Sequence, residues 1–131
     1  MMRYVVALVL FSTACTKEKE KVISGTVELE QELKDAVKPE DTVFVIARKA
    51  AGGPPLAAKK IPATAFPLTF TLTEKDVMMG GPFEGDVEIT VRIDKDGDAM
   101  TKNPGDMHGK SAGTVSVGDK NVKVLINQTI Q

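Results

Sequence analysis

The chain has 131 residues, a formal net charge of −1 and a single cysteine, Cys15. This length provides one domain with one hydrophobic core. The near-neutral charge argues against binding to nucleic acid or to an acidic partner surface. One cysteine excludes an internal disulfide and a site built from several thiolates.

Residues 1–14 are predicted to be a lipoprotein signal peptide. They contain a basic start, an apolar run too short for a membrane-spanning helix of about 20 residues, and small residues before a cleavage site. The segment Ser12-Thr13-Ala14-Cys15 resembles the lipobox of bacterial lipoproteins, although Ser12 stands where that motif usually has Leu. We therefore expect cleavage before Cys15 and a lipid on its thiol. An ordinary secretory signal with an incidental cysteine is the alternative.

Residues 15–21 are predicted to be the lipidated cysteine and a charged tether, which spans about 20 Å when extended. The lipid would hold the protein in the bacterial cell envelope, facing the periplasm. Thr16 rather than Asp follows Cys15, which favours the outer membrane if the host is Gram-negative. The folded domain is expected to occupy residues 22–131.

The domain has the alternation of apolar and polar residues that is typical of β-strands. A first strand is expected at 23–29, and residues 30–37 could form one helical turn before Pro39. Leu68, Phe70 and Leu72 alternate with threonines, which is the pattern of a half-buried strand. The complete set of expected strands is 23–29, 42–48, 56–61, 68–73, 87–93, 113–117 and 122–130.

Seven short strands, short connections and at most one short helical turn predict an all-β fold, a two-sheet β-sandwich. The threonine and charged faces of the strands would lie outside. Aliphatic residues together with Phe44, Phe66 and Phe70 would fill the core.

Several blocks carry a family resemblance: residues 24–27, 41–48, 52–57, 67–72, 91–93, 97–100, 104–106 and Gly109. In this order they resemble the C-terminal periplasmic domain of cytochrome c biogenesis proteins of the CcmI/CycH type, over about residues 22–130. The resemblance implies a periplasmic chaperone that holds apocytochrome c for covalent haem attachment. The family protein carries transmembrane helices and a tetratricopeptide region ahead of this domain. A lipid on Cys15 would replace those helices as the anchor.

The residue types needed for catalysis are sparse. His108 is the only histidine, so a serine or threonine nucleophile has few bases available. Residues 80–82 lack the lysine and the helix start of a phosphate-binding loop. Residues 94–98 have some of the acidic residues of a calcium loop, but Gly97 comes one place early and no Glu follows. We predict a non-enzymatic protein with a hairpin turn at residues 94–98.

Five residues form a candidate metal site in predicted loops: Met78, Met79, Met100, Met107 and His108. Thioether sulfur is a soft ligand that suits Cu(I), and an imidazole could complete the coordination. These residues would bind copper if the loops converge at one end of the sandwich. The alternative is that they pack within the loops or form an adaptable apolar surface.

Gly52, Gly53, Pro54 and Pro55 form a second candidate site. Two consecutive prolines could stiffen a loop that contacts a partner. A simple hairpin connection is the alternative.

These features favour a membrane-anchored, non-enzymatic binding or chaperone-like domain without a cofactor, whose partner is apocytochrome c or another envelope protein. Exposed strand edges or Met-bearing loops would provide its binding surface. A periplasmic Cu(I) metallochaperone is the first alternative. A structural envelope lipoprotein is the second.

Overall fold

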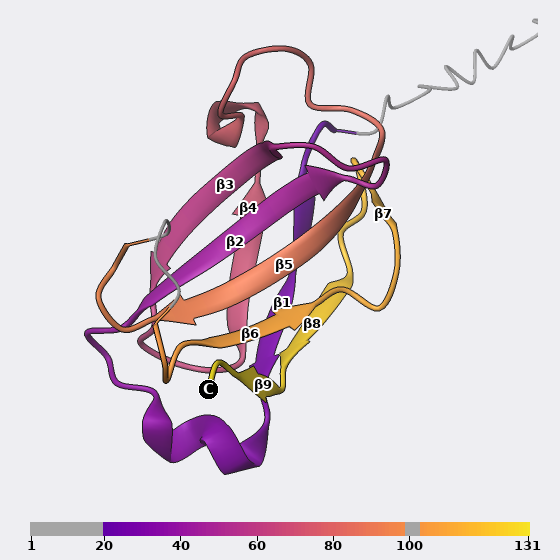
Figure 1. The fold of residues 1–131 in the computed structure, drawn as a ribbon. Helices are drawn as coiled ribbons and strands as arrows, with labels where there is room; N and C mark the ends of the chain where they lie inside the picture. The colour runs from indigo at the N-terminus through magenta and orange to yellow at the C-terminus, as the bar shows by residue number, and fades with distance from the viewer. Residues whose placement is uncertain (1–19, 99–102) are drawn as a thin grey trace, which may run out of the picture.

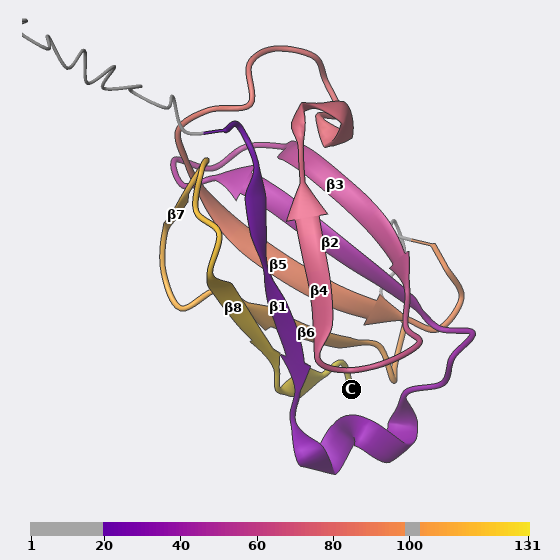
Figure 2. The ribbon, with the colours of Figure 1, turned by 180° about the vertical axis from the view of Figure 1, so that it is seen from behind.

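The computed structural model describes residues 20–98 and 103–131, which form two packed β-sheets (Figures 1 and 2). The three-stranded sheet has the order β4 (Leu68–Leu72), β1 (Ile23–Leu29) and β8 (Val122–Ile126), with β1 and β8 parallel. The six-stranded sheet has the order β3 (Pro55–Pro62), β2 (Thr42–Lys49), β5 (Asp86–Asp94), β6 (Met107–Lys110) and β9 (Gln128–Thr129), and β7 (Val115–Ser116) pairs with β5. The predicted all-β sandwich is confirmed.

Alternation of side chains explains how the sheets pack. On β4, Leu68, Phe70 and Leu72 are buried while Thr69 and Thr71 are exposed, and β8 has the same pattern. Because successive side chains of a strand point to opposite faces, one face of each sheet is apolar. The two apolar faces pack against each other and form the core.

The aromatic residues of the core match the prediction in part. Phe70 is in the core and Phe66 packs against it, as expected. Phe44 is buried but lies outside the core cluster, because Val43 and Val45 take the inward positions of β2. Phe83, which precedes β5, is fully buried in the core and was not predicted.

Over residues 20–98 and 103–131 the structure has nine strands rather than the seven expected. The expected strand at 122–130 is two strands, because β8 pairs with β1 in one sheet and β9 pairs with β6 in the other. The strand expected at 113–117 is reduced to β7. The short strand β6 was missed because its sequence, MHGK, lacks β-branched alternation.

Short 3-10 helices lie near the two ends of the sandwich (Figure 1). The helix η1 (Gln31–Ala36) confirms the expected helical turn, and Leu33 and Val37 pack against the core. A second one, η2 (Glu74–Asp76), was not predicted and begins with a capping box between Thr73 and Asp76. Within the described ranges, no helix has the length and hydropathy needed to cross a membrane. The proposed signal peptide, Cys15 and Met100 lie outside the described residues.

Candidate functional site

The outer face of the six-stranded sheet carries a groove with a volume of about 450 Å³. On this face Ile46 of β2 lies opposite Thr90 of β5, and Thr90 lies opposite Lys110 of β6. Three neighbouring strands therefore contribute alternate side chains to one surface. We call this surface the sheet groove; it is lined by Ile46, Arg48, Glu88, Thr90, Arg92, His108, Lys110 and Ile130.

A second hollow of about 430 Å³ adjoins the sheet groove and shares His108 and Lys110 with it. It continues past Gly109 to Leu125 on β8. At Gly109 a Cβ atom would lie only 2.0 Å from the carbonyl oxygen of Leu125, so the glycine allows β6 and β8 to approach closely. The combined surface spans two inter-strand spacings from β2 to β6, about 10 Å. It then continues onto β8 of the other sheet.

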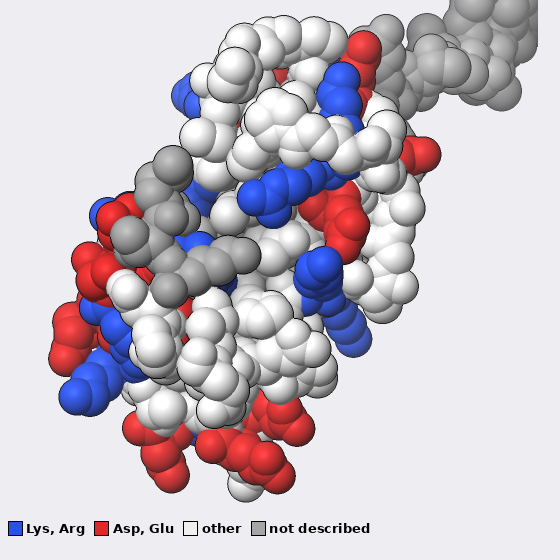
Figure 3. Space-filling model, in the orientation of Figure 1, with Lys and Arg blue, Asp and Glu red and all other residues white. Residues whose placement is uncertain are grey.

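The sheet groove combines cationic and apolar side chains. Its lining contains three cations, Arg48, Arg92 and Lys110, and one carboxylate, that of Glu88. Lys110 Nζ lies 3.6 Å from Glu88 Oε1, but both side chains are largely exposed, so this ion pair contributes little stability. In Figure 3, charged side chains flank an uncharged, hollowed surface in the middle of this face. Such a surface suits a ligand that carries carboxylates beside apolar groups.

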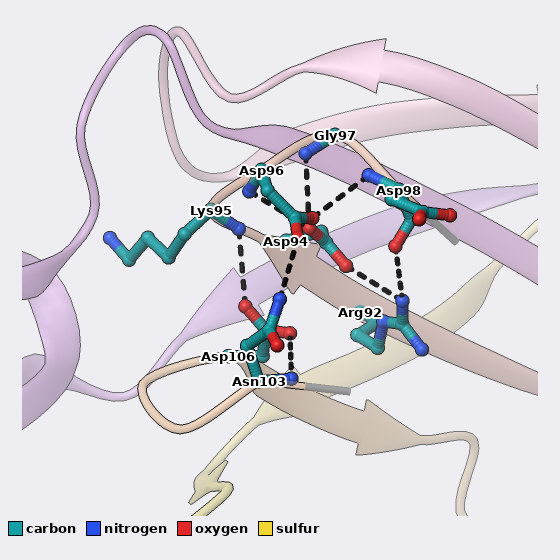
Figure 4. Close-up of polar contacts among 8 residues, drawn as sticks. All are labelled: Arg92, Asp94, Lys95, Asp96, Gly97, Asp98, Asn103 and Asp106. Carbon is teal, nitrogen blue, oxygen red and sulfur yellow. Dashed lines mark hydrogen bonds and ion pairs between the residues drawn. The ribbon is translucent and has the colours of Figure 1, made fainter. Parts of the chain in front are cut away.

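Arg92 is held in the groove by a buried ion pair (Figure 4). Its Nη2 donates to Asp94 Oδ2 at 2.7 Å and to the carbonyl oxygen of Asp98 at 2.9 Å. The side chains of Arg92 and Asp94 are only 9% and 0% exposed. Burial raises the pKa of the Asp94 carboxyl, and the Arg92 guanidinium opposes that shift. The pair fixes the direction of the guanidinium at one end of the groove.

Carboxylates also organise the connection between β5 and β6. Asp94 Oδ1 accepts hydrogen bonds from the backbone N–H groups of Asp96 and Gly97, both at 3.0 Å. Asp106 Oδ1 and Oδ2 accept from the N–H groups of Lys95 and Asn103 (Figure 4). The turn expected at residues 94–98 is thus present, and its acidic side chains bind backbone. Over residues 20–98 and 103–131, no group of three His, Cys, Asp or Glu residues is placed to hold a metal ion.

The same connection is tied to η1. Lys95 Nζ lies 2.5 Å from Oδ2 of Asp41, and the Asp41 side chain is almost fully buried. Lys95 Nζ also donates to the carbonyl oxygen of Ala36. Ile130 is fixed nearby, because its N–H donates to the Asp106 carbonyl oxygen at 2.7 Å. These contacts place the Arg92 and Ile130 end of the groove near η1.

The structure separates the residues of the predicted copper site. Met78 and Met79 follow η2 and are 59% and 79% exposed. The expectation that Met107 and His108 lie in a loop is wrong, because both are on β6. Met107 is 1% exposed and packs in the core.

The two groups also lie near opposite ends of the six-stranded sheet. Met107 on β6 is paired with Ile93 on β5, and Ile93 is paired with Val43 on β2. The Met78 N–H donates to the carbonyl oxygen of Leu56 on β3. The next residue of β3, Ala57, is paired with Ala47 on β2. Four residues along β2, about 13 Å, and two intervening strands therefore separate the groups, and they do not share one site.

Gly52, Gly53 and Pro54 lie in the exposed connection from β2 to β3, and Pro55 is the half-buried first residue of β3. Both glycines have positive φ angles, 99° and 106°, which other residues rarely adopt. Gly52 N–H donates to the Lys49 carbonyl oxygen at 2.9 Å. The segment thus belongs to the hairpin connection between β2 and β3, and its predicted role in partner binding stays a prediction.

Sequence reasoning missed most of the sheet groove. Arg48, Glu88 and Lys110 are far apart in the chain and meet only through the register of three strands. The one available signal was the outward position of charged residues on predicted strands 42–48 and 87–93.

Comparisons with known proteins agree with this architecture. The family model of the cytochrome c-type biogenesis protein H Ig-like domain matches residues 23–127. An uncharacterised protein of Aquifex aeolicus is 32% identical over 117 residues, which cover 88% of this chain and 76% of that protein. The cytochrome c-type biogenesis protein CycH of Pseudomonas aeruginosa is 36% identical over 83 residues, which cover 57% of this chain but only 19% of that protein.

Among solved structures, an alternative pilotin from the type II secretion system of Vibrio cholerae is similar in part. It superposes with a TM-score of 0.48 at 15% sequence identity, over 82% of this chain and 96% of that chain. The family match, in contrast, extends from the start of β1 to just past the end of β8. The chain therefore belongs to the family of cytochrome c-type biogenesis protein H Ig-like domains.

Proposed function

We propose that this protein is a lipid-anchored, non-enzymatic binding domain that faces the periplasm and acts in c-type cytochrome biogenesis. The family match over residues 23–127 carries the proposal. A lipid on Cys15 would hold the domain at a membrane. Its partner would be apocytochrome c or another envelope protein, bound as an unfolded or extended segment.

The sheet groove is the surface that best supports binding of a polypeptide segment. With its extension to Leu125, it crosses β2, β5 and β6 and reaches β8, which is long enough for several residues. Ile46 and Ile130 provide apolar contacts, and Arg48 and Lys110 provide exposed cations at the rim. A segment with acidic and apolar residues matches this surface in charge and polarity.

The edge strands of the two sheets are less suitable than the sheet groove for binding a polypeptide segment. Lys59 Nζ donates to the Thr71 carbonyl oxygen at 3.0 Å, so this acceptor on the edge strand β4 already has a hydrogen-bond partner. Near the start of β3, Ala57 forms a bridge with Val77. Both edges are thus partly covered, as is usual for sheets that avoid adding another strand.

The test is a binding titration of the purified protein with a haem-free c-type cytochrome from the same host. We expect measurable affinity, and we expect the charge reversals Arg48→Glu and Lys110→Glu together to weaken it about tenfold or more, since rim charges govern encounter and orientation. The matched control is Lys34→Glu with Lys123→Glu, two exposed lysines on η1 and on the other sheet. This control makes the same change in net charge and should leave the affinity near that of the wild type.

Equal weakening in both double variants would show that binding depends on overall charge and would remove the sheet groove from the proposal. Absence of binding by the wild type would contradict the proposed binding of apocytochrome c and would favour a structural envelope lipoprotein.

A further inference from the structure

The loop between η2 and β5 carries the most exposed large apolar side chains of the described residues. Met79 is 79% exposed and Met78 is 59% exposed, and Leu125, at 45%, follows them. Two adjacent exposed apolar side chains on a projecting loop mark a contact surface more often than scattered single ones do. Methionine suits such a surface because its side chain is flexible and polarisable.

Both ends of this loop are fixed to the domain. At its start, Asp76 Oδ2 accepts from the Thr73 N–H at 2.9 Å, and the Met78 N–H donates to the Leu56 carbonyl oxygen at 3.0 Å. Toward its end, Phe83 is fully buried in the core. The loop is therefore held at its base while the two methionine side chains remain in solvent.

The chain enters the domain at the same end of the sandwich (Figures 1 and 2). Lys21 Nζ lies 3.7 Å from Glu74 Oε1 of η2, and the Gly118 N–H donates to the Val22 carbonyl oxygen at 2.7 Å. Cys15 precedes Glu20 by five residues, which span at most about 18 Å. A lipid on Cys15 would thus place this end of the sandwich close to the membrane surface.

We propose that residues 78–82 rest on the lipid surface to which the protein is anchored, with the Met78 and Met79 side chains among the lipid headgroups. The inference rests on the proposed lipid anchor, and it adds the orientation of the domain. Apolar side chains at such an interface reach about 5–10 Å into the boundary between headgroups and acyl chains. The sandwich would stand on this end, and the sheet groove on its flank would remain open to a partner.

The chain has no tryptophan, so single reporters can test this orientation. The Met79→Trp and Leu125→Trp variants place the reporter at two exposed apolar positions, one on the loop and one on β8. Each lipidated protein is produced in a bacterial envelope and reconstituted into phosphatidylethanolamine and phosphatidylglycerol vesicles that contain brominated phosphatidylcholine. The fluorescence of each variant is compared with and without bromine, and attachment is measured by flotation of the vesicles.

We expect both variants to float and only Met79→Trp to shift its emission to the blue and lose about half of it to bromine, because bromolipid quenching requires burial at the interface. Equal quenching of the two floating variants, or none in either, would overturn the orientation while leaving the anchor intact. Failure of both variants to float would overturn the anchor and the inference with it. A Met78→Trp variant repeats the test at the neighbouring position and should behave as Met79→Trp does.

Discussion

At the scale of single residues, the methionines of the described ranges, Met78, Met79 and Met107, fall into two groups by burial. Met107 packs in the core opposite Ile93, whereas Met78 and Met79 are solvent-exposed. The sequence gives no sign of this division, because methionine is common both in cores and at contact surfaces. Only the pairing of β6 with β5 decides it.

The first prediction separates these roles by stability. Met107→Ala should lower the free energy of unfolding by about 2–5 kcal/mol, since it removes buried volume from the core. Met79→Ala should change it by no more than about 0.5 kcal/mol, as is usual for exposed positions. Denaturant unfolding of both variants measures the difference, and comparable losses would contradict the assignment of Met107 to the core.

The second prediction concerns the pH dependence contributed by Asp94. Burial raises its pKa in the folded protein above the ordinary value of 3.8, so the folded state binds this proton more tightly than the unfolded state does. The contribution to stability is therefore fully present below the unfolded pKa, and it is lost as the pH rises through the folded pKa.

An Asp94→Asn variant removes this titration while keeping the shape of the side chain. The stability of the wild type relative to Asp94→Asn should therefore decrease as the pH rises from below 3.8 toward neutrality. Denaturant unfolding of both proteins at a series of pH values measures this difference. A difference that increases with pH would mean that the Arg92 ion pair outweighs burial and lowers the pKa of Asp94.

At the scale of secondary structure, the sequence predicted the strands with clear alternation. The expected strand at 23–29 coincides with β1, and those at 42–48 and 68–73 end within one residue of β2 and β4. It could not reveal that the chain changes sheets at Asn127, because no Gly or Pro interrupts residues 122–130. Sheet membership depends on long-range pairing with β1 and β6, which a local pattern does not encode.

The third prediction tests the close approach of β6 and β8. Gly109→Ala would place a Cβ atom 2.0 Å from the backbone oxygen of Leu125, so one strand must move. We expect a loss of about 1–3 kcal/mol in the free energy of unfolding, typical of overpacking.

Gly113 is the matched control, because a Cβ atom there would have no neighbour within 4 Å. Gly113→Ala should leave stability nearly unchanged when measured by the same unfolding experiment. If both variants unfold like the wild type, β6 and β8 do not approach as closely as the structure places them.

At the scale of the whole molecule, the two-sheet architecture followed from the sequence, but the candidate site did not. The net charge of −1 argued against an acidic partner, yet the exposed charges of the sheet groove are two cations, Arg48 and Lys110, and one carboxylate, that of Glu88. The acidic residues that balance them lie elsewhere, in part at the η1 end of the molecule. A whole-chain charge cannot describe one face, because that face is assembled from strands distant in sequence.

The proposed functions fit one arrangement of the molecule. The loop between η2 and β5 and the entry of the chain share one end, and η1 lies at the opposite end (Figure 1). Strands β2, β5 and β6, whose outer face bears the sheet groove, lie between these ends. An anchored domain in this orientation would leave its groove uncovered by the membrane. Bromolipid quenching tests the orientation, and charge reversal at Arg48 and Lys110 tests the groove.

Mapping the partner onto the domain by NMR tests the central claim most directly, that the sheet groove holds a polypeptide partner. Backbone amide signals of the purified protein are followed while a haem-free c-type cytochrome is added. We expect the signals that change to belong to β2, β5, β6 and the segment around Leu125, while those of β1 and β4 stay unchanged. Changes confined to β1 and β4, or none at saturating partner, would contradict it.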